Sequence, residues 1–333
     1  MELFDRSKLN LLPISAKKSK IKIEDMVIDP DSNSYNKIKG YDRIEKISDE
    51  IIKARNNDRP VIVAFGAHLI RNGLTPILRR MVQENYLTHL ATNGAGSIHD
   101  WEFAYHGQTL EDVEEYVLKG QFGIWDEIGK YINLAINSGA KLGKGYGESV
   151  GEMIKNEKLI MDNNEIKIPH PFKKYSIQEA AFSERVPFTV HPGFGYDIIY
   201  SHPSSDGASI GKTAEIDFLR FAQSVSKLEG GVYISIGSAI MSPMIFEKSL
   251  SMSRNVSHQE GKKIDDFMIV VNDIKENEWE FGSGKEPLKN HPSYYDRLCK
   301  SFKRMGAREL HYIKADNRDF LVNLYQCLKA KNI

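Results

Sequence analysis

The fold is decided by residues 60–73, which read Pro-Val-Ile-Val-Ala-Phe-Gly-Ala-His-Leu-Ile-Arg-Asn-Gly. Residues 60–65 are apolar, and the glycine after them opens a helical pattern. A short apolar run without polar alternation is typical of a strand that is buried on both faces of a parallel sheet. The segment therefore predicts a strand over residues 60–65 and a tight turn into a helix.

Further short apolar runs of the same kind alternate with helical patterns along the chain. They cover residues 87–92, 187–190, 232–236, 267–271 and 310–313. Strands that alternate with helices form a parallel sheet covered by helices on both faces. We therefore expect an α/β protein with a doubly wound, mostly parallel, Rossmann-like sheet of six strands or more.

The organisation around this sheet is predicted from composition. Residues 1–58 are expected to form an N-terminal arm and a lead-in helix, because residues 15–39 are polar and lack periodicity. Residues 59–333 are expected to form a single Rossmann-like domain with a helical insertion around residues 107–174. The glycines of Gly143-Lys-Gly-Tyr-Gly147 follow a helical pattern instead of a strand, which predicts a helix cap and turn.

Charge and composition exclude several classes of function. The chain of 333 residues carries 45 basic and 45 acidic side chains, so no global field would recruit nucleic acid or an anionic membrane. No signal peptide is recognisable, and no apolar run approaches the ~18 residues of a membrane span. Neither the histidines nor Cys299 and Cys327 have metal-ligand spacing. We expect a cytoplasmic protein without a metal site.

Residues 205–213 read Ser-Asp-Gly-Ala-Ser-Ile-Gly-Lys-Thr and end like a phosphate-binding P-loop. A P-loop places four residues between its first glycine and Gly-Lys-Thr. Here Asp206 stands in place of that glycine, and Gly207 leaves the loop too short. A P-loop NTPase, with residues 267–273 as its magnesium-binding strand, is one hypothesis.

The loops that follow the predicted strands are small, glycine-rich or polar. They cover residues 66–73, 93–100, 237–239, 272–273 and 315–317. Tight turns need Gly and Asn for backbone reasons alone, so a single such loop has little weight. Several together favour a ligand site, because open α/β sheets bind ligands beyond the carboxyl ends of their strands.

These loops resemble, in order and over roughly residues 60 to 330, those of deoxyhypusine synthases. The matching segments are 64–73, 92–96, 206–211, 237–255 and 312–316. The family contains tetrameric Rossmann-like enzymes that use NAD to dehydrogenate spermidine and pass a butylamine unit, through an enzyme lysine imine, to a lysine of a translation factor. The resemblance implies a homo-oligomer, either dimer or tetramer, with sites near subunit interfaces. It also implies NAD contacts at His68, Asn93, Gly94, Asp206, Ser283 and Asp316.

The departures from this family concern its chemistry. Ser242-Pro243 replaces the family's Lys-His pair, and His99 and Lys212 replace two acids that hold the polyamine. Lys303 lies at the family's distance from Asp316 for the imine-forming lysine. The resemblance therefore implies Lys303, His99 and Lys212 as catalytic candidates, and a small-molecule substrate with an anionic group to meet Lys212.

Our leading hypothesis is an enzyme that binds NAD or a similar nucleotide. It would act on a substrate other than spermidine by dehydrogenation or imine-mediated group transfer. The alternatives are an authentic deoxyhypusine synthase, a P-loop NTPase and a non-catalytic binding paralogue.

Overall fold

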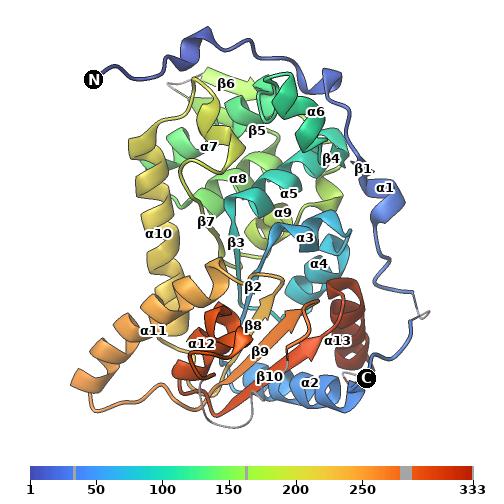
Figure 1. Cartoon of the computed structure of the whole chain (residues 1–333), viewed down its shortest axis with the longest axis vertical. Coiled ribbons are helices and arrows are strands. Elements are labelled where there is room, and N and C mark those ends of the chain that lie inside the picture. Colours follow the sequence, from blue (N-terminus) through green and yellow to red (C-terminus); the bar gives the residue numbers. More distant parts are fainter. Residues whose placement is uncertain (33–34, 162–163, 278–286, 332–333) are drawn as a thin grey trace.

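The structure, a computed structural model, describes residues 1–32, 35–161, 164–277 and 287–331. Its centre is a parallel sheet of six strands in the order β10-β9-β8-β2-β3-β7 (Figure 1). The strands are β2 (Val61–Phe65), β3 (His89–Asn93), β7 (Phe188–His191), β8 (Val232–Ile236), β9 (Met268–Asp273) and β10 (Glu309–Lys314). Each overlaps one predicted strand, which confirms the predicted sheet.

The direction of strand addition reverses between β2 and β8. The chain builds β2, β3 and β7 outward on one side and then returns to build β8, β9 and β10 on the other. This is the order of a Rossmann sheet, so the predicted fold class is confirmed. The last residues of the strands are in register, with Phe65 opposite both Thr92 and Ile236. The loops after the strands therefore lie along one edge, which we call the carboxyl edge.

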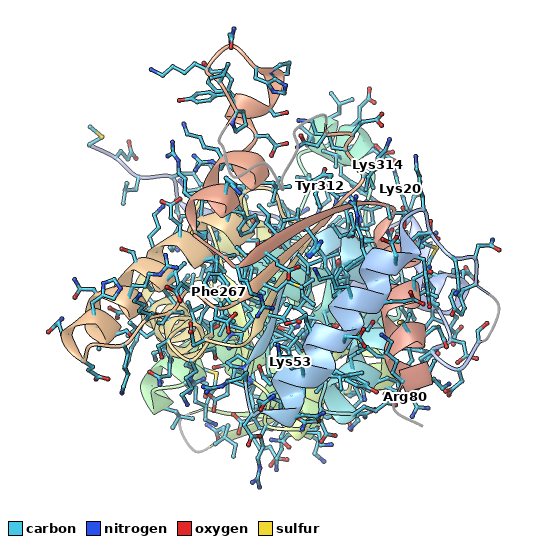
Figure 2. The ribbon with its side chains drawn as sticks, turned by 90° about the horizontal axis from the view of Figure 1, so that it is seen from below. Lys20, Lys53, Arg80, Phe267, Tyr312 and Lys314 are labelled. Carbon is cyan, nitrogen blue, oxygen red and sulfur yellow. The ribbon has the colours of Figure 1, made fainter. Side chains whose placement is uncertain are left out.

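Helices cover both faces of the sheet, as Figures 1 and 2 show. One face carries α10 (Gly207–Val225), α11 (Met241–Gln259) and α12 (Arg297–Arg304). The other carries α2 (Tyr41–Asn56), α4 (Thr75–Gln83) and α13 (Asn317–Lys331), and α2 packs along α13. Side chains alternate between faces along a strand, so double coverage explains why β2 and β8 are buried at every residue.

A helical region lies between β3 and β7. It contains α5 (Gly94–His106), α6 (Val113–Leu118), α7 (Asp126–Leu142), α8 (Tyr146–Asn156) and α9 (Ile177–Ser183), with a hairpin of β5 (Lys158–Met161) and β6 (Asn164–Lys167). Gly143 ends α7 with a left-handed φ of 69°, and α8 begins at Tyr146. The glycine cluster is therefore a helix cap and turn, as predicted.

The chain before α2 runs along the outside of this helical region (Figure 1). It includes β1 (Ile21–Lys22), which pairs with β4 (Gln108–Thr109), and α1 (Ile23–Met26). The remaining elements are α3 (Ala67–Arg71) and the 3₁₀ turns η1 (Arg6–Lys8), η2 (Ile14–Ala16), η3 (Lys173–Tyr175), η4 (Ile198–Ser201) and η6 (Pro292–Tyr295). Within the described residues, every helix is too short or too polar to cross a membrane.

Candidate functional site

The segment that resembles a P-loop forms the start of α10. Asp206 caps this helix, since its Oδ2 accepts hydrogen bonds from the Ser209 amide at 2.9 Å and the Ser209 hydroxyl at 2.6 Å. The Thr213 hydroxyl donates to the Ser209 carbonyl at 2.9 Å. A helix that follows the 3₁₀ turn η4 offers no phosphate-binding loop after a strand. The P-loop NTPase hypothesis is therefore wrong. The residues that resemble a P-loop in the sequence form the capped start of a helix in the structure.

Two backbone loops meet where the strand order reverses. We call residues 66–68 and 237–240 the switch-point loops. The Gly66 amide donates to the Ile236 carbonyl at 3.1 Å, and the Gly237 amide donates to the Asn272 carbonyl at 3.0 Å. A Cβ on Gly66 would overlap the Gly237 carbonyl oxygen, so no larger residue fits there. Gly237 itself has a left-handed φ of 55° and open space around it.

The switch-point loops present backbone donors without partners. Among the described residues, no hydrogen bond is made by the amides of Ala67, His68, Ser238, Ala239 and Ile240. Backbone amides at the start of a helix that follows a strand are the usual cradle for the phosphates of a dinucleotide. In the loop that leads into α11, residues Gly237, Ala239 and Ile240 are exposed to solvent, which leaves room for a ligand.

An acceptor without a partner lies beside these donors. The Asn272 side chain donates to the carbonyls of Ile313 at 3.2 Å and Ala315 at 3.0 Å. Its Oδ1 is buried and accepts no hydrogen bond from the described residues. Asp273, the last residue of β9, adds a partly exposed carboxylate at the same edge. An acid at this place in a Rossmann sheet suits the hydroxyl groups of a ribose.

A cavity of about 240 Å³ opens beyond the end of β3, against α5, and we call it the α5 cavity. Its wall combines cations, acids and apolar side chains. The basic side chains are Lys17, Arg71 and His99, the acids are Glu102, Glu111 and Asp197, and the apolar part includes Ile98, Leu110 and Phe122. A small, partly apolar pocket with converging polar groups is the usual form of a small-molecule site.

His99 is held by a carboxylate in the wall of the cavity. Its Nδ1 lies 3.0 Å from Glu102 Oε2 and 2.7 Å from the Thr109 hydroxyl oxygen. An ionised carboxylate can only accept a hydrogen bond, so Nδ1–H is the donor. Glu102 also forms a buried ion pair with Lys17. Burial opposes the charge of Glu102, but Lys17 and His99 outweigh it and lower the pKa of Glu102 to about 2. With Nδ1 as the donor, His99 Nε2 carries a lone pair and has no partner among the described residues.

Arg71 is the cation of this cavity without an anion. Among the described residues, its guanidinium makes no hydrogen bond or ion pair, and its Nε is buried. Burial lowers the pKa of Arg71. Burial lowers the pKa of His68, and the neighbouring Arg71 and His99 lower it further. The helix α3 begins in the first switch-point loop and ends at Arg71, so it joins that loop to the wall of the cavity.

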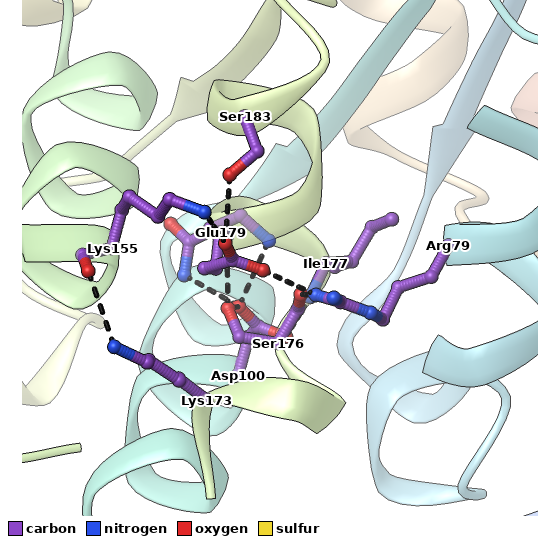
Figure 3. A network of polar contacts seen from close by, with 9 residues as sticks. Arg79, Asp100, Lys155, Lys173, Ser176, Ile177, Glu179 and Ser183 are labelled. Carbon is purple, nitrogen blue, oxygen red and sulfur yellow. Dashed lines mark hydrogen bonds and ion pairs between the residues drawn. The ribbon is translucent and has the colours of Figure 1, made fainter. Parts of the chain in front are cut away.

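A buried aspartate next to His99 fixes the position of α5. Asp100 accepts hydrogen bonds from the Ser176 hydroxyl at 2.6 Å, the Ile177 amide at 2.9 Å and the Gln178 amide at 3.2 Å (Figure 3). These donors form the start of α9, so the carboxylate ties the two helices together. Arg79 and Glu179 add an ion pair beside them at 2.7 Å.

The predicted cofactor contacts are distributed unevenly. His68, Asn93, Gly94 and Asp316 all follow strands and lie at the carboxyl edge. Asn93 caps α5 by accepting the Gly96 amide at 3.0 Å. Asp206 is the exposed N-cap of α10, a helix that follows the 3₁₀ turn η4 instead of a strand. Ser283 lies outside the described residues.

The predicted catalytic residues are not brought together. His99 lines the α5 cavity, whereas Lys212 is exposed on α10 and does not line it. Lys303 lies in the last turn of α12, which leads into the amino end of β10 and thus toward the opposite edge of the sheet. Of these three residues, His99 is the one that lines the α5 cavity.

Three charged residues of the cavity wall are not among those predicted from the sequence: Lys17, Arg71 and Glu102. Glu102 was detectable, since it follows His99 by three residues on a predicted helix and can therefore share its face. Arg71 lies inside a loop that we had singled out for its glycines. No sequence pattern indicates a role for Lys17, because only the folding of the arm brings this residue into the wall of the cavity.

Solved structures with this fold have low sequence identity to the chain. An LOR/SDH-type protein of Methanococcus maripaludis S2 is 16% identical over 91% of this chain and 72% of that chain, with a TM-score of 0.53. Unliganded AgrE is 15% identical over 87% of this chain and 33% of its own, with a TM-score of 0.51. A protein from Entamoeba histolytica assigned as a deoxyhypusine synthase is 10% identical over 97% of both chains, with a TM-score of 0.45.

This chain spans only 33% of the length of the AgrE chain and of ArgZ, an arginine dihydrolase from cyanobacteria. AgrE has also been solved as a ternary complex with ornithine and NAD+. No protein-family model matches the chain, and no curated protein matches it. At these identities the likeness shows the fold alone: a Rossmann-like α/β sheet of the kind that the resemblance implied.

Proposed function

We propose that this protein is an NAD-dependent enzyme that oxidises a small molecule in the α5 cavity. The observation that carries the proposal is the set of unpaired backbone amides in the switch-point loops, at the one place where a Rossmann sheet receives a dinucleotide. The α5 cavity adjoins these loops through α3, which begins in the first loop and carries Arg71 in the cavity wall. A cofactor site and a substrate site would then share one edge of the sheet.

The residues of the edge suit the parts of the cofactor. The amides of Ser238, Ala239 and Ile240 would hold the pyrophosphate, since they lack protein partners among the described residues. Asn272 Oδ1 and Asp273 offer acceptors for ribose hydroxyl groups. NAD, when bound, supplies an acceptor for a hydride from a substrate carbon.

The side chains of the cavity supply the proton chemistry. His99 Nε2 can accept the proton of a substrate hydroxyl or amino group, while Glu102 holds the ring in the required tautomer and stabilises its charged form. Lys17 keeps Glu102 ionised, as the low pKa of that carboxylate shows. The ion-paired Lys17 is a poor amine nucleophile, which favours dehydrogenation over transfer through a lysine imine.

The alternatives receive less support. A polyamine would meet the unpaired Arg71, which disfavours authentic deoxyhypusine synthase activity. A non-catalytic paralogue has no need of a histidine and carboxylate that converge on a cavity. Lys212 and Lys303 stay predictions, and either would reach the cavity from another copy in the homo-oligomer that we propose. Light scattering measures the number of subunits in the assembly.

Calorimetric titration tests the cofactor. We expect NAD to bind saturably and ATP with magnesium to bind weakly, because residues 205–213 form the capped start of a helix instead of a P-loop. The absence of heat at millimolar NAD would refute the cofactor assignment. NADH absorbance in the presence of candidate substrates then tests oxidation, with His99→Gln expected to lower turnover by ~100-fold or more, as for loss of a general base.

A further inference from the structure

The wall of the α5 cavity contains one cation, Arg71, that no anion of the described residues contacts. Lys17 and Glu102 neutralise each other as a buried ion pair. Glu111 accepts hydrogen bonds from Trp125 Nε1 at 2.9 Å and the Gly123 amide at 3.2 Å. Asp197 accepts from the Gly193 amide at 2.8 Å. Arg71 alone among the cavity's arginine and lysine side chains has no anion among the described residues, and a desolvated charge without a partner is costly.

The surroundings of Glu111 and Asp197 limit the charge that a ligand can carry. Burial raises the pKa of both carboxyl groups, although their hydrogen bonds oppose this. A ligand with two negative charges would face both acids in a small space. One negative charge balances Arg71 with less of that repulsion. A carboxylate also matches the planar fork of a guanidinium with two parallel hydrogen bonds.

The rest of the wall specifies the body of the ligand. Ile98, Leu110 and Phe122 supply apolar surface, and the volume of about 240 Å³ limits the ligand to a small molecule. His99 Nε2 supplies one acceptor for a hydroxyl or amino proton. The wall therefore combines an anion partner, a proton acceptor and a short apolar surface.

We propose that the α5 cavity binds a small monocarboxylic acid that carries a hydroxyl or amino group and a short apolar side chain. Arg71 binds the carboxylate and is the residue that sets this specificity. The inference rests on the proposed function for its reaction, but binding of the acid requires no nucleotide and can be measured alone. It moves the expected anion partner from Lys212, on the surface of α10, to Arg71 inside the cavity.

The test compares 2-hydroxy-3-methylbutanoate with its neutral amide by calorimetric titration of the full chain without NAD. We expect the acid to bind the wild type at least tenfold more tightly than the amide. Arg71→Met should abolish this preference, Arg71→Lys should retain part of it, and Arg297→Met, which removes an exposed arginine of α12, should leave it unchanged. Near-ultraviolet circular dichroism checks that each variant is folded.

Equal binding of acid and amide by the wild type would overturn the inference without any variant. So would a preference that survives in folded Arg71→Met, or tighter binding of inorganic phosphate than of the acid. A separate NAD titration distinguishes the two proposals. Acid binding without NAD binding would refute the proposed function and keep the cavity assignment, whereas NAD binding without acid binding would do the reverse.

Discussion

Glu102 Oε2 lies 3.0 Å from His99 Nδ1, and the other oxygen of the same carboxylate is paired with Lys17. One buried carboxylate thus connects a residue of the N-terminal arm to the imidazole that faces the cavity. Each oxygen of the carboxylate is bonded to a different partner. A substitution of Lys17 therefore alters the charge environment of His99, although the two residues share only Glu102. The first prediction concerns this connection.

Lys17→Met should destabilise the protein by ~3 kcal/mol or more, because it leaves Glu102 buried without its cation. The free energy of unfolding in urea measures this change. Lys18→Met is the matched control, since Lys18 is exposed and its ion pair with Glu115 spans 3.8 Å. An exposed pair of this kind contributes about 0–1 kcal/mol, so equal effects of the two variants would contradict the buried pair.

Gly66→Ala should lower stability and abolish NAD binding, because its Cβ would overlap the Gly237 carbonyl oxygen. Gly237→Ala has open space and only the strain of its left-handed φ of 55°, which costs about 1–2 kcal/mol. We expect Gly237→Ala to fold and to bind NAD more weakly. Thermal unfolding and calorimetry measure both quantities, and wild-type affinity in folded Gly66→Ala would place the cofactor elsewhere.

Asp217→Asn should stabilise the protein at pH 8. Burial raises the pKa of the Asp217 carboxyl from 3.8 to about 7, although the Gly147 and Val190 amides donate to it. Between these values the native state binds more protons than the unfolded state, so this carboxyl lowers the free energy of unfolding as pH rises from about 4 to 7. The pKa difference limits the effect to about 4 kcal/mol.

The measurement is the free energy of unfolding of wild type and Asp217→Asn between pH 4 and pH 8. Their difference should grow across this range and level off above it. Asp206→Asn is the control on the same helix, because Asp206 is exposed and its hydrogen bonds to Ser209 lower its pKa. A constant difference between wild type and Asp217→Asn would show that Asp217 is ionised throughout.

Asp100→Ala should cost ~3 kcal/mol or more, because several buried donors at the start of α9 lose their acceptor (Figure 3). Asp112→Ala removes an exposed cap of α6 that accepts the Glu115 amide at 2.9 Å, and should cost about 1 kcal/mol. Urea unfolding compares the two. If Asp100→Ala costs no more than Asp112→Ala, water replaces the carboxylate and α5 is held by other contacts.

The sheet was predictable because its signal is local. Each strand is a short apolar run buried on both faces, and the helices between the runs require parallel pairing. The switch-point loops could be listed from the sequence, since Gly66 and Gly237 directly follow such runs. Their close approach could not, because it depends on β8 pairing with β2 across a long stretch of chain.

The α5 cavity was harder to predict for the same reason. Its wall draws Lys17 from the arm, Arg71 from α3 and Asp197 from the loop after β7. No local pattern shows which of the chain's cations loses its water on folding. We therefore assigned the anion to Lys212, whose charge was unusual for the resembling family, whereas the structure leaves Lys212 on the surface.

The described part of the arm that precedes α2 contributes no strand to the central sheet, yet its Lys17 side chain is part of the cavity wall. A shortened chain designed to keep only the sheet and its helices would lack that side chain. It would keep every strand of the Rossmann sheet and lose the counter-charge that keeps Glu102 ionised beside His99. For this protein, the smallest unit that folds and the smallest unit that functions are therefore expected to differ in length.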